Sequence, residues 1–336
     1  MSHIRKFIPI LAISVMSCAG AVTADGFTNR TDIQTFIDEL VTRHGFERQS
    51  LKTLFDNTER RQDIIDAISR PAEAKPWHQY RPIFLNTQRI SGGVEFWNQH
   101  AALLDKAEQV YGVPPEIVTA IIGVETRYGA STGRYRVMDS LATLAFDYPP
   151  RAAFFRGELE QFLLLAREEA ADPLSIKGSY AGAMGQGQFI SSSYRHYAVD
   201  FDGDGKRDLW NSTADAIGSV ANYFHVHGWK PGEPVASRAR VQGNAYKELV
   251  AQDLKPHTSL AQLQTQGVTA SDTLPPDALA ALIELETENG VEHWLGLDNF
   301  YVITRYNRSR LYAMAVYQLS QEIRSQRPGA LNARSK

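Results

Sequence analysis

The sequence predicts a mainly α-helical, α+β fold in which one small segment contains β-strands. Most of the chain repeats its apolar residues with the period of an α-helix. Residues 235–297 depart from this pattern, because they contain runs in which apolar and polar residues alternate. Two of these runs are separated by Asn289 and Gly290, the strongest short signal of a β-hairpin. With 336 residues, 43% of them hydrophobic, the chain can form one large domain or two to three small ones.

Residues 1–24 are expected to be an export signal. Arg5 and Lys6 precede the apolar run Phe7–Met16, which is too short to cross a bilayer as a helix and is typical of a signal-peptide core. Cys18, the single cysteine of the chain, follows in a context that resembles a lipobox and is therefore a candidate for lipidation. The alternative is cleavage after Ala24, which would give a soluble periplasmic protein instead of an outer-membrane lipoprotein facing the periplasm.

The charge balance limits the classes of partner. The formal net charge is −3, and removing residues 1–17, which hold two basic and no acidic residues, makes it more negative. Binding to nucleic acid needs clustered Lys and Arg, so nucleic acid is not expected as a partner. No later apolar run could span a membrane, so any attachment should be through a lipid. One cysteine also excludes an intrachain disulfide.

Residues 25–112 are expected to form an N-terminal helical domain. Thr31 can cap a helix that ends at Gly45. Its apolar face would comprise Ile33, Phe36, Ile37, Leu40 and Val41. Pro71 and Pro76 interrupt the helical period further on. A later helix is expected to run through Leu103, Leu104, Ala107 and Val110.

Residues 113–234 are expected to form the core domain, completed by residues 298–336, with residues 235–297 as an insertion. Pro114 and Pro115 suit the first turn of a helix that is expected to end at Gly129. Three later helices should centre on Leu159–Ala166, Ile217–His227 and Leu311–Ile323. In the insertion, strands are expected at Val235–Val241, Leu282–Glu286 and Val291–Leu295.

Glu125 is the first candidate for chemistry. At helical spacing it shares a face with the apolar residues Val118, Ile121 and Ile122. Desolvation and the negative end of the helix dipole both favour the protonated carboxyl there, as a general acid requires. The alternative is a buried ion pair with Arg127 or another base.

A glycine-rich segment, Lys177–Phe189, is the second candidate site. Its four glycines allow the backbone to approach a ligand closely, and Ser179 and Gln188 add hydrogen-bonding side chains. The glycine order and the lack of a preceding strand do not fit a dinucleotide loop. The segment is either a ligand-binding loop or a tight connection between helices.

The third candidate site resembles the start of an EF-hand calcium loop. Aspartate stands at positions 1, 3 and 5 and glycine at position 6, namely Asp200, Asp202, Asp204 and Gly205. Position 12 is Asn211 in place of the usual Glu, and Asp215 could close a longer loop. The alternative is a solvated Asp/Gly-rich turn.

The fourth candidate, Asn299–Asn307 followed by Tyr312, groups tyrosines with Asn and Arg. Such side chains suit a sugar-binding cleft, where rings stack on pyranose faces. The alternative is that these aromatic rings pack into the core.

Taken together, these segments resemble the family of membrane-bound lytic murein transglycosylase B. The resemblance runs from about Tyr80 to Leu319 and rests on four ordered motifs, V-E-T-R-Y-G, K-G-S-Y-A-G-A-M-G-Q-G-Q-F, D-x-D-G-D-G followed by A-I-G-S-V-A-N-Y-F, and N-F-Y-V-I-T-R-Y-N. It implies a lysozyme-like catalytic core, an N-terminal helical domain and a small β domain. It also implies that Glu125 is the catalytic acid/base and that no catalytic cofactor is needed.

The resemblance further implies two sets of binding residues. Those for substrate are Ser179, Gln188, Tyr80, Arg151, Tyr223, Tyr306, Asn307 and Tyr312. Those for a structural calcium ion are Asp200, Asp202, Asp204, Lys206 and Asp215. The chain departs from the family at Pro150, where relatives can carry Arg, and at Phe154, where a Tyr occurs. These changes put contacts of this segment with the peptide stem or the sugar in doubt.

The implied activity is non-hydrolytic cleavage of the β-1,4 bond between N-acetylmuramic acid and N-acetylglucosamine in peptidoglycan glycan strands. One carboxyl can suffice when the substrate's own N-acetyl group and C6 hydroxyl supply the other functions, giving a 1,6-anhydro product. A hydrolytic muramidase and a non-catalytic murein-binding scaffold are the alternatives. Enzymes of cell-wall synthesis or hydrolysis are possible protein partners.

Overall fold

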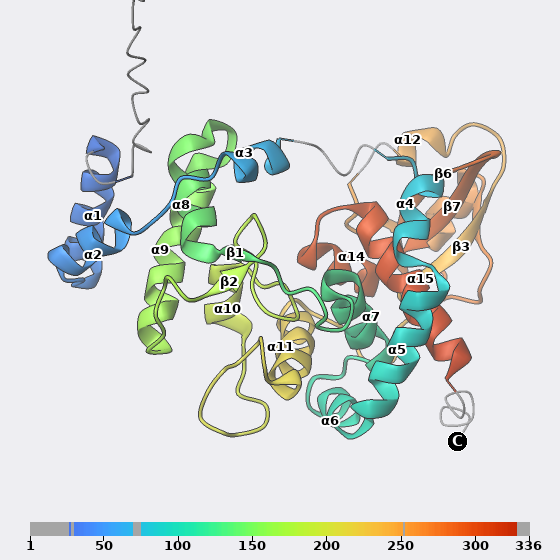
Figure 1. The fold of residues 1–336 in the computed structure, drawn as a ribbon. Helices are drawn as coiled ribbons and strands as arrows, with labels where there is room; N and C mark the ends of the chain where they lie inside the picture. Colours follow the sequence, from blue (N-terminus) through green and yellow to red (C-terminus); the bar gives the residue numbers. More distant parts are fainter. Residues whose placement is uncertain (1–26, 28–29, 70–74, 251–252, 328–336) are drawn as a thin grey trace, which may run out of the picture.

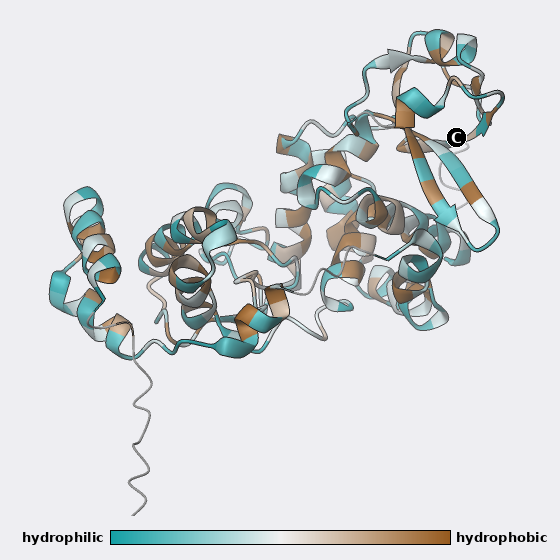
Figure 2. Ribbon diagram, turned by 90° about the horizontal axis from the view of Figure 1, so that it is seen from above, coloured by the Kyte–Doolittle hydropathy of each residue, from teal (hydrophilic) through white to brown (hydrophobic). Residues whose placement is uncertain are grey.

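The computed structural model describes Phe27 and residues 30–69, 75–250 and 253–327, and it shows a helical body with one β-sheet at its end (Figure 1). Viewed from above, α1 and α2 lie at one end of the molecule and the sheet lies at the other (Figure 2). Residues 1–24, with Cys18 and the expected export signal, lie outside the described residues. Within the described part of the chain, no helix is long and apolar enough to cross a membrane.

Helices make up most of the body. In chain order they are α1 (Thr31–His44), α2 (Arg48–Asp56), α3 (Gln62–Ile68), α4 (Trp77–Phe84), α5 (Thr87–Gln99), α6 (Ala101–Tyr111), α7 (Pro115–Thr126), α8 (Val137–Asp147), the 3-10 turn η3 (Pro149–Arg151), α9 (Ala152–Glu168), α10 (Ser191–Tyr197), α11 (Thr213–Val226), α12 (Lys247–Val250), α13 (Leu260–Thr265), α14 (Asp298–Tyr306) and α15 (Arg310–Gln326). The helices expected around residues 103–110, 159–166, 217–227 and 311–323 are thereby confirmed as α6, α9, α11 and α15.

The first helix begins one residue earlier than its expected cap implies. Thr31 is already helical, and Arg30 holds the N-cap position without a side-chain capping bond, although its guanidinium pairs with Asp32 of the first turn at 2.8 Å. Arg30 also donates to Asp147 at 2.7 Å, which ties α1 to α8. The expected end is confirmed, because Gly45 adopts the left-handed conformation at φ 65° and its N–H caps the carbonyl of Val41.

The α5 helix lies in the segment that was expected to be helical, but it was not predicted as a separate element. Its interior contains Gly92 and Gly93, which lower helix propensity. In the fold these glycines are needed, since a Cβ on Gly93 would lie 2.4 Å from Ile323 of α15 and one on Gly92 would lie 3.0 Å from the Tyr128 ring. Tertiary packing therefore overrides local preference here.

The helices of residues 25–112 fall into two groups. The α3 helix packs on α8, whereas α4, α5 and α6 pack on α7, α11 or α15 at the other side of the body (Figure 1). The division of the chain into domains at residues 112, 234 and 297 remains a prediction.

The helix that carries Glu125 begins at Pro115 as expected but ends three residues before the predicted Gly129. Its last helical residue is Thr126. Arg127 and Tyr128 both adopt left-handed backbone angles, with φ of 53° and 61°, so the helix cannot continue through them. Glu125 therefore lies in the final turn.

Two sheets are present in the described chain. A small one pairs β1 (Tyr135–Arg136) with β2 (Lys177–Gly178). The larger one has the order β4-β6-β7-β3-β5, with all pairs antiparallel, and contains β3 (Ala236–Val241), β4 (Thr258–Ser259), β5 (Val268–Ala270), β6 (Leu279–Thr287) and β7 (Gly290–Gly296). It confirms the β-containing insertion.

The expected hairpin is confirmed, with its turn one residue earlier than the Asn-Gly signal suggests. Thr287 pairs with Gly290, so Glu288 and Asn289 form the turn and Gly290 opens β7 with φ 140°. The larger sheet has its own apolar cluster, separate from the main core, which includes Leu249, Leu263, Val268, Leu282 and Leu295. The two ends of the inserted segment, residues 235–297, lie side by side, because the N–H of Leu297 donates to the carbonyl of Val235 at 3.0 Å.

Candidate active site

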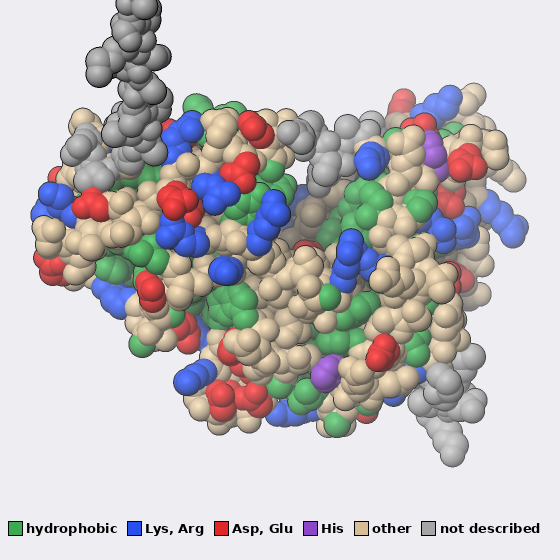
Figure 3. Space-filling model, viewed as in Figure 1, with side chains coloured by type: hydrophobic (Ala, Val, Ile, Leu, Met, Phe, Trp, Pro, Cys, Tyr) green, Lys and Arg blue, Asp and Glu red, His purple; other side chains and the backbone are tan. Residues whose placement is uncertain are grey.

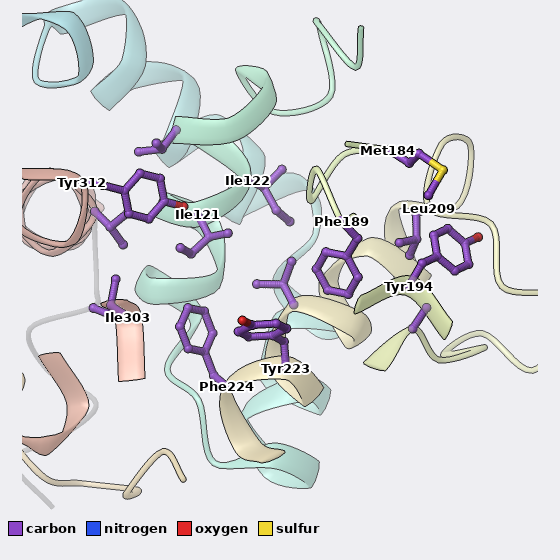
Figure 4. Packing of buried hydrophobic residues seen from close by; sticks show 14 of the residues in the cluster. Ile121, Ile122, Met184, Phe189, Tyr194, Leu209, Tyr223, Phe224, Ile303 and Tyr312 are labelled. Atoms are coloured by element: carbon purple, nitrogen blue, oxygen red, sulfur yellow. The ribbon is translucent and has the colours of Figure 1, made fainter. Parts of the chain in front are cut away.

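The α7 helix lies in the middle of the helical body and carries Glu125 at its end. It packs against α5, α6, α11 and α15, and its apolar side chains Ile121 and Ile122 lie in the main core near Tyr312 and Phe224 (Figure 4). Glu125 is the one residue between Pro115 and Thr126 that is not fully buried. The face drawn in Figure 3 is hollowed between the part that holds α8 and the part that holds α4.

Burial controls the protonation of Glu125. Desolvation raises the pKa of its carboxyl to about 7, while a hydrogen bond from Tyr312 and the charge of Arg89 act in the opposite direction. Among the described residues no ion pair joins Glu125 to a base, and Arg127 is exposed. The alternative of a buried Glu125–Arg127 pair is therefore absent from the fold. A carboxyl with a pKa near 7 can give and take a proton at neutral pH.

The tyrosines expected to line a sugar cleft mostly support the site from within. Tyr312 of α15 donates its hydroxyl to Oε1 of Glu125 at 2.5 Å. Tyr306 of α14 donates to the carbonyl of Gly187 at 2.5 Å. These bonds hold the carboxyl and the glycine-rich loop in place.

Two further tyrosines are buried in the walls of the site. Tyr223 of α11 donates to the carbonyl of Arg305 at 2.6 Å and lies 4.8 Å from the Tyr306 ring, centre to centre. Tyr80 of α4 lies 5.2 Å from the ring of Phe84. Tyr80, Tyr223 and Tyr312 are only 8%, 7% and 4% exposed, so stacking on sugar is limited to ring edges.

The glycine-rich segment is a loop, and its polar side chains shape it. Ser179 Oγ accepts from the N–H groups of Ala181 and Ala183, at 3.3 and 3.0 Å. Gln188 has a left-handed φ of 51° and donates its side-chain amide to the carbonyl of Thr132 at 3.1 Å. Both side chains are partly exposed. The strained backbone at Gln188 is typical of a functional loop.

The chain after α7 lies against this loop. Thr126 donates its hydroxyl to the carbonyl of Gln186 at 2.8 Å. Gly133 has φ 104°, and a Cβ there would lie 2.0 Å from the carbonyl carbon and oxygen of Gly178. The end of α7 and the glycine-rich loop are therefore in direct contact.

Two of the sequence-predicted binding residues lie further out. Arg151 is exposed in η3, with its guanidinium 4.4 Å from the ring centre of Phe154. Asn307 follows α14 and accepts from the N–H of Ser309 at 3.0 Å. Hydrogen bonds join Glu125 to Tyr312 and the glycine-rich loop to Tyr306, whereas Arg151 lies on the surface in η3, which contacts α8 and α9.

Arg89 and Tyr128 belong to this site and were missed. The guanidinium of Arg89 donates to the carbonyls of Gly123 and Val124, the latter at 3.2 Å, and the Tyr128 hydroxyl donates to the Arg89 carbonyl at 2.6 Å. Tyr128 stands in the motif around Glu125, which could have marked it. Arg89 lies in a helix that was not predicted as a separate element, so no signal pointed to it.

The aspartate-rich loop gathers three exposed carboxylates. Asp200, Asp202 and Asp204 each place an oxygen within 4.8 Å of the others. Three backbone N–H groups donate to Asp200 and lower the pKa of its carboxyl. Lys206, whose backbone N–H donates to Asp204 at 2.9 Å, belongs to the same turn. This donor set suits a hard cation such as Ca²⁺.

Asp215 has a different place from the other three. It is 1% exposed, and its two oxygens accept from the N–H groups of Phe201 and Asp208, both at 2.8 Å. Burial raises the pKa of its carboxyl. Asp215 therefore fastens the loop to the start of α11 and lies outside the group of three.

A helical body that buries a carboxyl beside a polar loop supported by tyrosines is typical of enzymes that cleave glycans by acid catalysis. Comparison with known proteins places it more closely. Residues 28–321 match the family model of the transglycosylase SLT domain. The chain is 47% identical over 307 residues to the membrane-bound lytic murein transglycosylase B of Escherichia coli K12, covering 88% of this chain and 84% of that protein.

Solved structures agree with this placement. The soluble lytic transglycosylase SltB1 of Pseudomonas aeruginosa is 54% identical, with a TM-score of 0.83, over 88% of this chain and 98% of that one. The Escherichia coli lytic transglycosylase Slt35 in complex with calcium is 48% identical, with a TM-score of 0.82, over 88% of this chain and 94% of that one. The chain belongs to the SLT family of peptidoglycan lytic transglycosylases and has their lysozyme-like fold.

Proposed function

We propose that Glu125 is the single acid/base of a non-hydrolytic cleavage between N-acetylmuramic acid and N-acetylglucosamine that forms a 1,6-anhydro product. The observation that supports this most is the setting of its carboxyl. Its pKa is raised to about 7 by burial, and the side chains that oppose this shift are Tyr312 and Arg89. No second carboxylate of the described residues contributes to the shift of this pKa, which favours a mechanism with one carboxyl.

The proposed reaction has two proton transfers. Glu125 donates its proton to the glycosidic oxygen as the bond from that oxygen to C1 of the muramoyl residue breaks, and the substrate's N-acetyl carbonyl stabilises the positive charge at C1. The Glu125 anion, held by the Tyr312 hydroxyl at 2.5 Å, then takes the proton of the C6 hydroxyl. The C6 oxygen bonds to C1, and no water is consumed. Proximity favours this attack over water.

Mass spectrometry of products from purified peptidoglycan tests this mechanism. We expect muropeptides ending in the anhydro sugar, one water lighter than hydrolysis products. Reducing-end products would instead show a hydrolytic muramidase, and binding without release of fragments would show a scaffold. Either result contradicts the proposal.

The proposed substrate contacts are polar side chains that are partly or fully exposed. Ser179 and Gln188 supply polar groups from the loop, Asn307 supplies one after α14, and Arg151 supplies one from η3. For Tyr80, Tyr223, Tyr306 and Tyr312, burial favours edge contacts and support of the site. Peptidoglycan glycan strands are the substrate of the family.

We further propose that Asp200, Asp202 and Asp204, with the backbone of Lys206, hold a structural calcium ion. A metal that binds the folded state alone raises the melting temperature with its concentration. Calcium is therefore expected to raise the melting temperature relative to chelator. At a hundredfold excess of calcium over Kd, the free energy of unfolding should rise by roughly 2.7 kcal/mol. Asp202→Asn should remove the effect, and the exposed Asp277→Asn should keep it. Identical melting curves with calcium and with chelator would contradict the site.

The anchor proposed at Cys18 has its own test. The relative from Escherichia coli is described as membrane-bound and SltB1 as soluble, so both forms occur among similar proteins. Lipidation at Cys18 predicts that Cys18→Ala moves the protein from the outer-membrane fraction to the periplasmic one. Equal fractionation of both variants would favour cleavage after Ala24.

A further inference from the structure

The carbonyl groups that end α7 are bound by an arginine from another helix. The last carbonyls of an α-helix have no partner within the helix. The carbonyl of Gly123 accepts from the N–H of Arg127 at 3.1 Å and also from the guanidinium of Arg89. The carbonyl of Val124 accepts from the same Nη1 of Arg89 at 3.2 Å. Val124 directly precedes Glu125. Arg89 therefore binds the peptide groups that carry the acid.

The setting of Arg89 directs its charge toward α7. It lies in the first turn of α5, where its N–H donates to the cap residue Asn86 at 3.0 Å, and its guanidinium lies 5.3 Å from the ring centre of Phe84. Its side chain is partly buried, and burial lowers its pKa. No carboxylate among the described residues forms an ion pair with it. Its positive charge is thus placed at the negative end of the α7 dipole.

Tyr128 and three glycines set the spacing between α5 and α7. The Tyr128 hydroxyl donates to the Arg89 carbonyl at 2.6 Å. A Cβ on Gly123 would lie 2.6 Å from the Tyr128 ring, and one on Gly93 would lie 2.7 Å from its hydroxyl. The ring fits because these positions and Gly92 have no side chain. The packing of the Tyr128 ring against these glycines holds α5 at the distance from which Arg89 reaches the carbonyls of Gly123 and Val124.

We propose that Arg89 is a positioning residue of the active site, whose guanidinium holds the last turn of α7 and with it the carboxyl of Glu125. Arg89 touches no reacting atom and acts through the backbone and through its charge. This inference rests on the role of Glu125 as acid/base proposed above.

The charged and titratable groups that face Glu125 come from three helices. They are Tyr312 of α15, Tyr306 of α14 and Arg89 of α5. The helices α6 and α11 also pack on α7, and Tyr223 of α11 acts on Tyr306. Because the charge of Arg89 lowers the pKa of Glu125, its removal should raise that pKa further above 7. The acid would then hold its proton to higher pH and donate it less readily.

Activity measured against pH in two variants separates charge from structure. In the wild type, kcat/KM is expected to fall above about pH 7, where Glu125 loses its proton. In Arg89→Gln this fall should move to higher pH, and kcat at neutral pH should drop about tenfold with little change in KM. In Arg89→Lys the charge remains, so the fall should stay near its wild-type position.

Arg167→Gln is the matched control. Arg167 also lies beside an aromatic ring, 4.3 Å from the centre of Phe46, and donates to the carbonyl of His44 at the end of α1. Its loss should alter stability without altering the pH profile or kcat. Folded Arg89→Gln with the wild-type profile would overturn the proposal.

Tyr128→Phe is the second variant should Arg89→Gln not fold. It keeps the ring in its slot and removes the bond to the Arg89 carbonyl, so kcat should fall about threefold or more with KM unchanged. Wild-type kcat in Tyr128→Phe would then overturn the proposal. An active Glu125→Gln would overturn the proposed acid/base itself, whereas an inactive Glu125→Gln beside an unaltered Arg89→Gln would reject the role of Arg89 alone.

Discussion

Replacing Glu125 with glutamine is expected to lower turnover of peptidoglycan by at least about a thousandfold. The amide has nearly the shape of the acid but has no acidic proton to give to the leaving oxygen. It also cannot accept the proton of the C6 hydroxyl, so both halves of the proposed reaction are lost. Release of soluble muropeptides by purified protein, measured over time, checks the loss.

The control for this variant lies on the same helix. Glu116, at the start of α7, is also a buried carboxylate and pairs with Arg324 at 3.5 Å, far from the loop. Glu116→Gln should keep near-normal kcat. Binding of Glu125→Gln to insoluble peptidoglycan should remain, because the loop and the tyrosines are intact. Near-normal turnover in Glu125→Gln would remove this residue from the mechanism.

Gly133→Ala is the second change expected to have a large effect, this time on stability and activity together. The new Cβ would lie 2.0 Å from the backbone of Gly178 and 2.5 Å from the N–H of Ser179, and backbone cannot swing aside as a side chain can. The segment would have to leave the glycine-rich loop and break the pairing of Tyr135 with Gly178. We expect a loss of about 3 kcal/mol or more in the free energy of unfolding.

Thermal melting and muropeptide release measure the two effects of this change. Gly228→Ala is the matched control, because Gly228 also has a positive φ of 89° and has no atom within 4 Å of the new Cβ. It should cost only the conformational penalty, about 1 kcal/mol, and should keep activity. Equal melting temperatures for the two variants would show that the contact with Gly178 is not tight.

The parts of the fold that follow from local chemistry could be predicted from the sequence. Pro115 at the first turn located the start of α7, and the alternating runs around Asn289 located the hairpin. Gly45 located the end of α1 by its left-handed conformation. In each case one residue type has a strong backbone preference that the fold obeys.

What could not be predicted depends on tertiary contacts. The bounds of α5 were not predicted within the expected helical segment, and Gly92 and Gly93 look unfavourable in a helix until the ring of Tyr128 is placed beside them. The end of α7 was set too late because Arg127 and Tyr128 adopt angles that few residues other than glycine adopt.

The site was predicted only in part for the same reason. Glu125 and the glycine-rich loop were found from their sequence setting. The role of Tyr312 was read as stacking on sugar, whereas the fold directs its hydroxyl to the carboxyl. The direction in which a tyrosine hydroxyl points depends on how the helices pack. The same is true of a contact from a distant helix, such as that of Arg89 with the end of α7.

The hydrogen bond between Val235 and Leu297 means that residues 235–297 leave and rejoin the helical body at adjacent positions. The sheet is also part of the main core, to which it supplies the side chains of Ile283, Leu285 and Trp294. The orientation of the sheet is set by separate braces, from Trp77 to Glu292 at 3.0 Å and from Tyr317 to the carbonyl of Ala236 at 3.1 Å. A different segment inserted between Val235 and Leu297 would therefore have to supply apolar side chains in place of Ile283, Leu285 and Trp294 to keep the helical body packed.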